Sequence, residues 1–204
     1  MIDGLFKKYI DPLWEFPARP LARVFTANQV TILGLGLISV ASLAYVWHRS
    51  PVWFAVTLAL AFSADSLDGA VARIRNECSA FGGYLDAVVD RYQELVALAA
   101  LAYVSDAWPA AYFALSGAFL TSYMKARTAV ETKIDNAAWP DLFERQERIF
   151  FICIALVCQG VFGSRTGLAG GLIPPALWLL ALLTHLTALQ RFWRARSILQ
   201  KSGL

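Results

Sequence analysis

The sequence predicts an all-α integral membrane protein with six transmembrane helices and an N-terminal amphipathic juxtamembrane helix. Three observations support this fold class. Of the 204 residues, 58% are hydrophobic and only 16% are charged, which is unusual for a soluble domain. Uncharged runs of about 20 residues, enough to span a bilayer, recur along the chain. Lys and Arg are concentrated in alternate connections between these runs.

Residues 1–27 are predicted to form an interfacial segment, and residues 28–204 to form one membrane domain. The first segment mixes apolar and aromatic side chains with lysine and arginine, a pattern typical of helices that lie in the membrane surface. Pro12, Pro17 and Pro20 are expected to break this helix, because proline lacks the backbone N–H that a helix interior needs.

Six segments with few charges are predicted to cross the membrane. They are, in chain order, Asn28–Trp47, Pro51 to about Arg73, about Phe81 to Ser105, Ala107–Met124, Ile149–Gly163 and about Leu168 to Gln190. An even number of spans puts both termini on one side. Of the 18 Lys and Arg, only Arg49 and Arg165 fall in connections on the other side. By the positive-inside rule, both termini face the cytoplasm, and we expect a multi-pass protein of the cytoplasmic membrane.

Four aspartates lie at the cytoplasmic ends of the second and third predicted spans. Asp65 and Asp68 are three residues apart and Asp86 and Asp90 are four apart, so each pair shares one helix face. An aspartate at mid-membrane costs roughly 2.5–3.5 kcal/mol, so the four must face water or bind cations. Oxygen ligands without His or Cys favour Mg²⁺, Mn²⁺ or Ca²⁺. Two such ions about 3.5–4 Å apart can hold a phosphoryl group during displacement.

Small and basic residues between the two pairs suit a flat, phosphorylated ligand. Gly69 and Ala72 share a helix face with Asp65, and Arg73 follows them. Small side chains let a ligand approach the backbone, and arginine can pair with phosphate. Two other interpretations are an ion path in a cation-coupled transporter and carboxylates that are merely solvated. A transporter would need polar residues through the whole membrane depth, and the predicted spans are nearly free of ionisable groups away from their cytoplasmic ends. The role of Cys78, in the link between the pairs, stays open.

Residues 65 to 90 together resemble the signature of the CDP-alcohol phosphotransferase family. The pattern D-x2-D-G-x2-A-R-x8-G-x3-D-x3-D is met by Asp65, Asp68, Gly69, Ala72, Arg73, Gly82, Asp86 and Asp90. The resemblance implies an enzyme that transfers the phosphatidyl-type group of a CDP-linked lipid to a hydroxyl of a polar acceptor and releases CMP. It implies two Mg²⁺ ions, replaceable by Mn²⁺, on the four aspartates. It also implies that Asp90 is the base that takes the acceptor proton.

The same resemblance implies a set of residues that contact CDP. The sequence TANQVT at 26–31 is similar to the Thr-Pro-Asn-x-x-Thr start of the family's first membrane helix, with Ala27 where proline is usual. The implied CDP-binding residues are Asn28, Thr31, Asp68, Gly69, Ala72, Arg73 and Gly82. Asn28 and Thr31 are equally explained as residues that cap a helix N-terminus.

Basic residues downstream are candidates to bind an acceptor phosphate. They are Lys125, Arg127, Arg145, Arg148 and Arg191. Arginine offers paired hydrogen bonds to phosphate, but the positive-inside rule alone also places cations here. The sequences SYMKAR and ERQER resemble the family branch that makes phosphatidylinositol phosphate or archaetidylinositol phosphate.

That branch implies inositol 1-phosphate as the acceptor, with glycerol 3-phosphate as the main alternative. The lipid can be CDP-diacylglycerol or CDP-archaeol, since one apolar groove would accept the chains of either. The family further implies a homodimer in a lipid bilayer, and no nucleic-acid partner is expected.

Overall fold

The computed structural model describes residues 14–132, 141–168 and 170–201, apart from the side chains of Ala64, Asp65 and Lys201, and most of these residues are helical. Within these ranges there is no strand, so the all-α prediction is confirmed. The long helices are α2 (Ala27–His48), α3 (Pro51–Arg75), α4 (Ala80–Ser105), α5 (Trp108–Glu131), α6 (Arg145–Phe162) and α7 (Ile173–Lys201), and a 3₁₀ helix, η2 (Gly163–Arg165), follows α6.

Local sequence signals define the helix N-termini near the charged part of the chain. Thr26 and Gln29 form a capping box at the start of α2. Ser79 caps α4 by accepting a hydrogen bond from the backbone. Glu144 and Glu147 form a second capping box at α6. Such caps satisfy backbone N–H groups that have no partner within the helix, and they fix the three helix ends that border the cavities described below.

Two helices are longer than their predicted spans. α5 continues past Met124 to Glu131, and α6 begins at Arg145 instead of Ile149. The prediction ended each span at its first charged residues. Lys, Arg and Glu are good helix formers, so the helix continues beyond the apolar run.

The last helix is shifted along the chain relative to its predicted span. α7 begins at Ile173 rather than about Leu168, and it continues past Gln190. Gly170 and Gly171 have φ angles of 74° and 72°. These left-handed conformations suit glycine but not a continuous right-handed helix, so the turn delays the start of α7.

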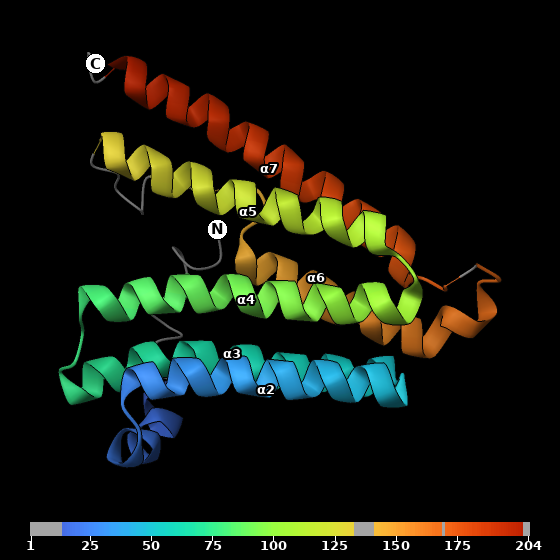
Figure 1. The fold of residues 1–204 in the computed structure, drawn as a ribbon, viewed down its shortest axis with the longest axis horizontal. Helices are drawn as coiled ribbons and strands as arrows, with labels where there is room; N and C mark the ends of the chain where they lie inside the picture. The colour runs from blue at the N-terminus through green and yellow to red at the C-terminus, as the bar shows by residue number, and fades with distance from the viewer. Residues whose placement is uncertain (1–13, 133–140, 169, 202–204) are drawn as a thin grey trace.

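The helices pack in two groups, with α6 between them (Figure 1). α2 packs against α3 and α4, α5 packs along α7, and α6 packs mainly on α3. The largest buried apolar side chains include Ile38, Phe54, Leu58, Leu101, Leu156 and Leu180. Gly117 allows α5 and α7 to approach closely, since a Cβ there would lie only 2.2 Å from Oγ1 of Thr184.

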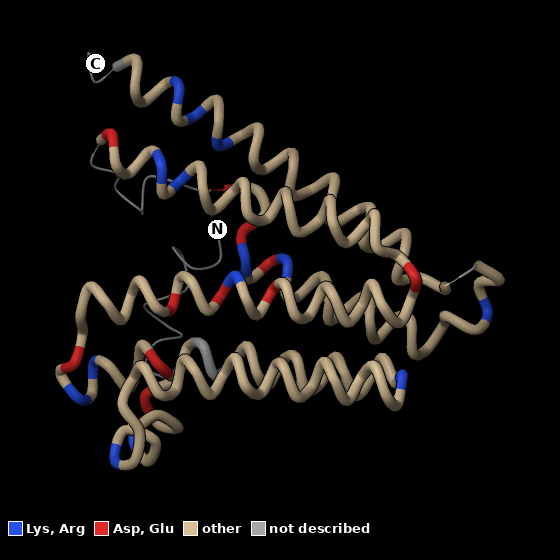
Figure 2. The backbone as a smooth tube through the Cα atoms, viewed as in Figure 1, with Lys and Arg blue, Asp and Glu red and all other residues tan. Residues whose placement is uncertain are grey.

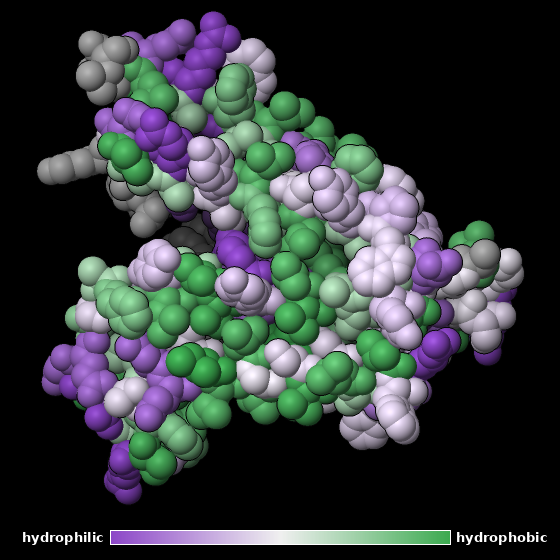
Figure 3. Space-filling view, viewed as in Figure 1, coloured by the Kyte–Doolittle hydropathy of each residue, from purple (hydrophilic) through white to green (hydrophobic). Residues whose placement is uncertain are grey.

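The outer surface is apolar over most of the helix length. Figure 3 shows a broad hydrophobic area on the visible face. The exposed large apolar side chains include Leu43 and Leu60. In the described part of the chain, four helical segments are long and apolar enough to cross a membrane: α2, α3, Arg145–Arg165 and Ile173–Gln200. α4 and α5 have sufficient length, 26 and 24 residues, but are not among these four segments. The structure is therefore that of a multi-pass membrane protein.

Most charged residues lie toward one end of the bundle (Figure 2). This end contains the first turns of α2, α4 and α6 and the last turns of α3, α5 and α7 (Figure 1). The turns at the opposite end carry Arg49, Asp106 and Arg165. The connections that are rich in charge along the sequence thus lie at one end of the bundle, and the connections with few charges lie at the other.

Residues 14–24 are helical and pack against α2 and α3. Ala18 is completely buried in this contact. The predicted breaks at Pro17 and Pro20 are wrong, because the helix runs through both. The φ of proline is compatible with a helix, and its cost is a missing backbone hydrogen bond. The part of the predicted interfacial segment before residue 14, with Pro12, lies outside the described residues.

Candidate functional site

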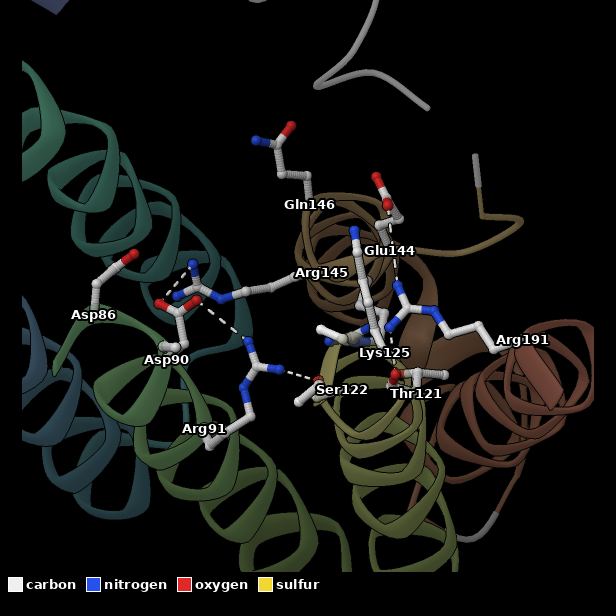
Figure 4. Close-up of a pocket in the computed structure, with 14 residues that line it drawn as sticks. Asp86, Asp90, Arg91, Thr121, Ser122, Lys125, Glu144, Arg145, Gln146 and Arg191 are labelled. Carbon is white, nitrogen blue, oxygen red and sulfur yellow. Dashed lines mark hydrogen bonds and ion pairs between the residues drawn. The ribbon is translucent and has the colours of Figure 1, made fainter. Parts of the chain in front are cut away.

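Two cavities lie at the charged end, on either side of α4. The smaller, about 200 Å³, is bordered by α2, α3 and α4. The larger, about 580 Å³, is bordered by α4, α5, α6 and α7 (Figure 4). In the space-filling view, a recess separates the two helix groups at this end (Figure 3). Asp86 lines both cavities, so ligands in the two cavities can meet at its side chain.

All the predicted CDP-binding residues line the smaller cavity. They are Asn28, Thr31, Asp68, Gly69, Ala72, Arg73 and Gly82. Thr31 does more than stabilise its own helix, because its Oγ1 donates a 2.5 Å hydrogen bond to Oδ2 of Asp68. This bond crosses from α2 to α3 and orients the carboxylate.

Glycine at position 82 keeps the wall of the smaller cavity thin where α4 faces α2. A Cβ added there would lie 3.2 Å from Oγ of Ser79 and 3.4 Å from Oδ1 of Asn28. Cys78 is exposed and also lines this cavity. The absence of side chains at Gly69 and Gly82 leaves room for a flat nucleotide close to the backbone.

The aspartates are distributed over both cavities. Asp68 lines the smaller cavity, Asp90 lines the larger, and Asp86 lines both. The side chain of Asp65 lies outside the described residues. Among the residues that are described, no three His, Cys, Asp or Glu side chains surround a common point. The donors present are carboxylate oxygens with a neighbouring hydroxyl, which is the chemistry that Mg²⁺ and Mn²⁺ prefer, so the residues fit a hard divalent cation.

Asp90 lies between two arginines in the larger cavity (Figure 4). Nη1 of Arg145 lies 2.9 Å from Oδ1 of Asp90, and Nη2 of Arg91 lies 3.3 Å from Oδ2. Arg145 also donates a 2.6 Å hydrogen bond to Oε1 of Gln93. Its guanidinium lies 5.3 Å from the ring centroid of Phe62. The carboxylate that the family resemblance implies as the base therefore contacts a cation through each of its oxygens.

Arg148 and Arg191 line the larger cavity, but both are bound to protein groups. Arg148 donates to Oε1 of Glu94 from Nε at 2.9 Å and from Nη2 at 2.5 Å, and both side chains are buried. Arg191 forms an ion pair with the buried Asp141 and donates to the backbone carbonyl of Thr121. These arginines connect α6 to α4, and α7 to α5 and to the segment before α6.

Lys125 and Arg127 differ although they are two residues apart on α5. Lys125 lines the larger cavity (Figure 4), and it forms no hydrogen bond or ion pair with the residues that the structure describes. Arg127 is not among the lining residues and pairs instead with Glu131. With 3.6 residues per turn, two positions rotate a side chain by about 200°. The structure thus brings together four of the predicted acceptor cations but not Arg127.

Several residues of the larger cavity and its supports were not predicted from the sequence: Arg91, Gln93, Glu94, Thr121, Ser122, Asp141 and Glu144. A local signal existed for Glu94, which continues the four-residue spacing of Asp86 and Asp90. No local signal existed for Asp141, since its partner Arg191 is far along the chain.

Sequence comparisons connect the chain with known proteins. The profile of the family described as CDP-alcohol phosphatidyltransferase matches residues 24–189. The archaetidylinositol phosphate synthase of Pyrococcus horikoshii is 30% identical over 201 residues, which cover 98% of this chain and 99% of the relative. The phosphatidylinositol phosphate synthase of Mycobacteroides abscessus is 30% identical over 94% of this chain and 86% of its own.

Solved structures agree with these relatives. The crystal structure of the Mycobacterium tuberculosis phosphatidylinositol phosphate synthase with CDP-DAG bound has a TM-score of 0.74 and 26% identity, covering 90% of this chain and 94% of the other. The same enzyme in complex with manganese and citrate has a TM-score of 0.73 and 27% identity, covering 89% and 88%.

Proposed function

This chain belongs to the CDP-alcohol phosphatidyltransferase family, and on that basis we propose that it transfers the phosphatidyl-type group of a CDP-linked lipid to inositol 1-phosphate. The products are CMP and a phosphorylated inositol lipid. The observation that carries the choice of acceptor is the larger cavity, in which Lys125 lies among arginines next to Asp90. The two relatives described above are named for inositol phosphate products. Because this family consists of transferases, membership in it argues against the interpretation as a cation-coupled transporter.

We assign the cytidine diphosphate to the smaller cavity. Arg73 contributes a positive charge for a phosphate, and the small residues Gly69, Ala72 and Gly82 leave room for the nucleotide beside the backbone. Asn28 and Thr31 approach the nucleotide from α2, and Thr31 also holds Asp68. The bound CDP-DAG in the structural neighbour is consistent with a CDP-linked lipid as donor.

We propose that Asp65, Asp68, Asp86 and Asp90 hold two Mg²⁺ ions, with Mn²⁺ as a substitute. When bound, the ions supply positive charge that stabilises the charge developing on the departing CMP. The manganese in the neighbouring crystal structure supports a divalent cation. Asp86 is suited to serve both sides of the site because it lines both cavities.

We propose that Asp90 is the base of the chemical step, as the family resemblance implies. Asp90 accepts the proton of the acceptor hydroxyl, and the hydroxyl oxygen forms a bond to the phosphorus that carries the lipid. The bond from that phosphorus to CMP breaks at the same time. Lys125, Arg145 and Arg191 orient the acceptor phosphate, while Arg148 holds α6 through Glu94. Holding the reactants in line supplies much of the rate, since proximity removes an entropic cost.

CMP release by the purified protein tests this proposal. The assay combines a CDP-linked lipid and Mg²⁺ with inositol 1-phosphate, glycerol 3-phosphate, inositol or serine, each in turn. We expect release with inositol 1-phosphate. Preference for glycerol 3-phosphate would keep the aspartate chemistry and overturn the acceptor. CDP-diacylglycerol and CDP-archaeol are compared in parallel, because the apolar helix surfaces suit either kind of chain.

We also propose that all six long helices span the cytoplasmic membrane, with both termini and the site on the cytoplasmic side. α4 is too charged to be identified by composition, but Asp86, Asp90 and Arg91 face the larger cavity rather than lipid, which is where ionisable residues in spans belong. The N-terminal segment lies in the interface in this arrangement, and the protein is a homodimer. Crosslinking in native membranes tests the dimer, and a purely monomeric pattern would contradict it.

A further inference from the structure

Arg145 lies between the cavity proposed for the acceptor and the proposed cation ligand Asp90. It lies in the first turn of α6 and lines the larger cavity. Its Nη1 pairs with Oδ1 of Asp90 at 2.9 Å. Its side chain is mostly buried, with 14% exposed. Among the other acceptor cations, Arg148 and Arg191 are paired with Glu94 and with Asp141. Of the four predicted acceptor cations in this cavity, Arg145 is therefore the one paired with a proposed metal ligand. Arg91, on α4, contacts the other oxygen of the same carboxylate.

This arrangement creates two competitions. A guanidinium and a divalent cation compete for the same carboxylate oxygen, because each neutralises its charge. An acceptor phosphate and Asp90 compete for the same guanidinium, because both are anions that accept its hydrogen bonds. A phosphate that binds Arg145 thus weakens the ion pair between Arg145 and Asp90. The divalent cation then has less competition for the Asp90 carboxylate.

We infer that Arg145 couples the two binding events: an acceptor phosphate draws Arg145 from Asp90, and Asp90 then binds the divalent cation more tightly. The inference rests on the proposed function, which supplies the phosphate and the cation. Because coupling between two ligands is reciprocal, the cation must raise the affinity for phosphate by the same factor. The acceptor phosphate then does more than anchor its own substrate, since it also prepares the site that receives the nucleotide phosphates.

The test measures binding of Mn²⁺ to the purified protein by electron paramagnetic resonance, with and without saturating inorganic phosphate and with no lipid substrate. For the wild-type protein, we expect phosphate to tighten Mn²⁺ binding roughly fivefold or more, the lower range of measured couplings. In Arg145→Gln, Mn²⁺ should bind more tightly than in wild type before phosphate is added, and the coupling should fall below about twofold.

Lys125→Gln is the matched control. Lys125 lines the same cavity and carries the same charge, but it has no contact with Asp90. This variant should need more phosphate to saturate, yet at saturation it should keep the wild-type coupling. Loss of coupling in both variants would overturn the inference, because it would trace the effect to the total charge of the cavity.

Two other results would also overturn it. Absence of coupling in wild type is one. The other is coupling that survives in Arg145→Gln, which would mean that phosphate contacts the cation directly. If Arg145→Gln fails to fold, Arg145→Lys replaces it, since a lysine cannot contact Asp90 and Gln93 with a two-pronged group; its coupling should also fall. CMP release by the wild-type protein with inositol 1-phosphate is measured separately. CMP release without coupling would contradict the inference alone, whereas no CMP release would contradict the proposed function.

Discussion

Asp90 is buried between two arginines at the edge of the larger cavity. It is only 8% exposed, and Arg91 and Arg145 each face one of its oxygens. The side chain thus combines low solvent access with an arginine at each oxygen, so any cation or substrate that binds Asp90 must share it with these two side chains.

We predict that Asp90→Asn removes turnover far more than nucleotide binding. Loss of a positioned base typically lowers the rate by about 10²–10⁴-fold, whereas Asp90 does not line the smaller cavity. Steady-state CMP release gives the first quantity, and equilibrium binding of CDP gives the second. Equal losses in both would identify Asp90 mainly as a cation ligand.

Lys125 and Arg127 provide a matched pair on one helix. Lys125→Gln should lower kcat/KM for inositol 1-phosphate by about 10–100-fold, because a charged hydrogen bond contributes roughly 1.5–3 kcal/mol. Arg127→Gln should change it by less than about twofold, because the Arg127–Glu131 pair is on the surface. The assay is CMP release at varied acceptor. Similar losses in both variants would contradict the assignment of the larger cavity.

The residues of the smaller cavity were predictable from sequence, whereas those of the larger cavity were only partly so. Gly69, Ala72 and Arg73 belong to one short stretch with fixed spacing, and helix periodicity places them together. The acceptor cations come from α5, α6 and α7, and their convergence depends on tertiary packing. Arg127 shows the limit, since charge and position near a helix end did not reveal on which face it lies.

Ion pairs, hydrogen bonds and apolar contacts connect the helices that border the larger cavity. α4 and α6 are connected by the buried Glu94–Arg148 pair, with Nη2 of Arg148 2.5 Å from Oε1. α5 and α7 are connected by apolar contacts and by Arg191, which reaches the Thr121 carbonyl. Each connection lies next to the larger cavity, so helix positions and cavity shape are determined together.

Arg148→Met should destabilise the protein because it removes the closer cation of the buried Glu94, 2.5 Å from Oε1, and leaves Nε of Arg91 at 4.0 Å from Oε2. Breaking a buried ion pair on one side costs about 3–5 kcal/mol, while replacing both charges with neutral groups is often tolerated. Thermal unfolding in detergent measures the effect. The double variant Arg148→Met with Glu94→Gln should recover part of the loss, and no recovery would mean that other contacts of Arg148 dominate.

Gly117→Ala should weaken the contact between α5 and α7. The new Cβ would lie 2.2 Å from Oγ1 and 2.8 Å from Cβ of Thr184, and rotation of the threonine cannot move its Cβ. Overpacking of this kind costs about 1–3 kcal/mol. Gly36→Ala on α2 is the control, because nothing lies within 4 Å of its added Cβ. Thermal unfolding of both variants decides, and equal midpoints would contradict the close packing.

The distribution of charge is the property of the whole molecule that the sequence predicted best. The alternation of basic and uncharged connections needs no knowledge of packing, and the structure places the charged connections at one end. The helix ends were predicted less well. Charged last turns of α5 and glycine turns before α7 changed the boundaries, because helix length depends on backbone conformation as well as on hydropathy.

We predict that Cys78 reacts with a membrane-impermeant maleimide from the cytoplasmic side alone. It is exposed at the charged end and lines the smaller cavity, while Cys153 and Cys158 are half-buried in α6. Inverted vesicles should label, intact cells should not, and CDP should slow the labelling. A variant with Cys78→Ser and Arg49→Cys should label with the opposite sidedness. Labelling of Cys78 from outside would contradict the proposed orientation.

Asp86 lines both the smaller and the larger cavity, and this arrangement determines the expected kinetics and stereochemistry. Separate cavities that meet at one carboxylate allow donor and acceptor to be bound together in a ternary complex. Initial-rate plots against either substrate should then intersect rather than run parallel. A single displacement within such a complex inverts the configuration at a phosphorus made chiral by isotopes, whereas a covalent lipid–enzyme intermediate would require two displacements and leave the configuration retained.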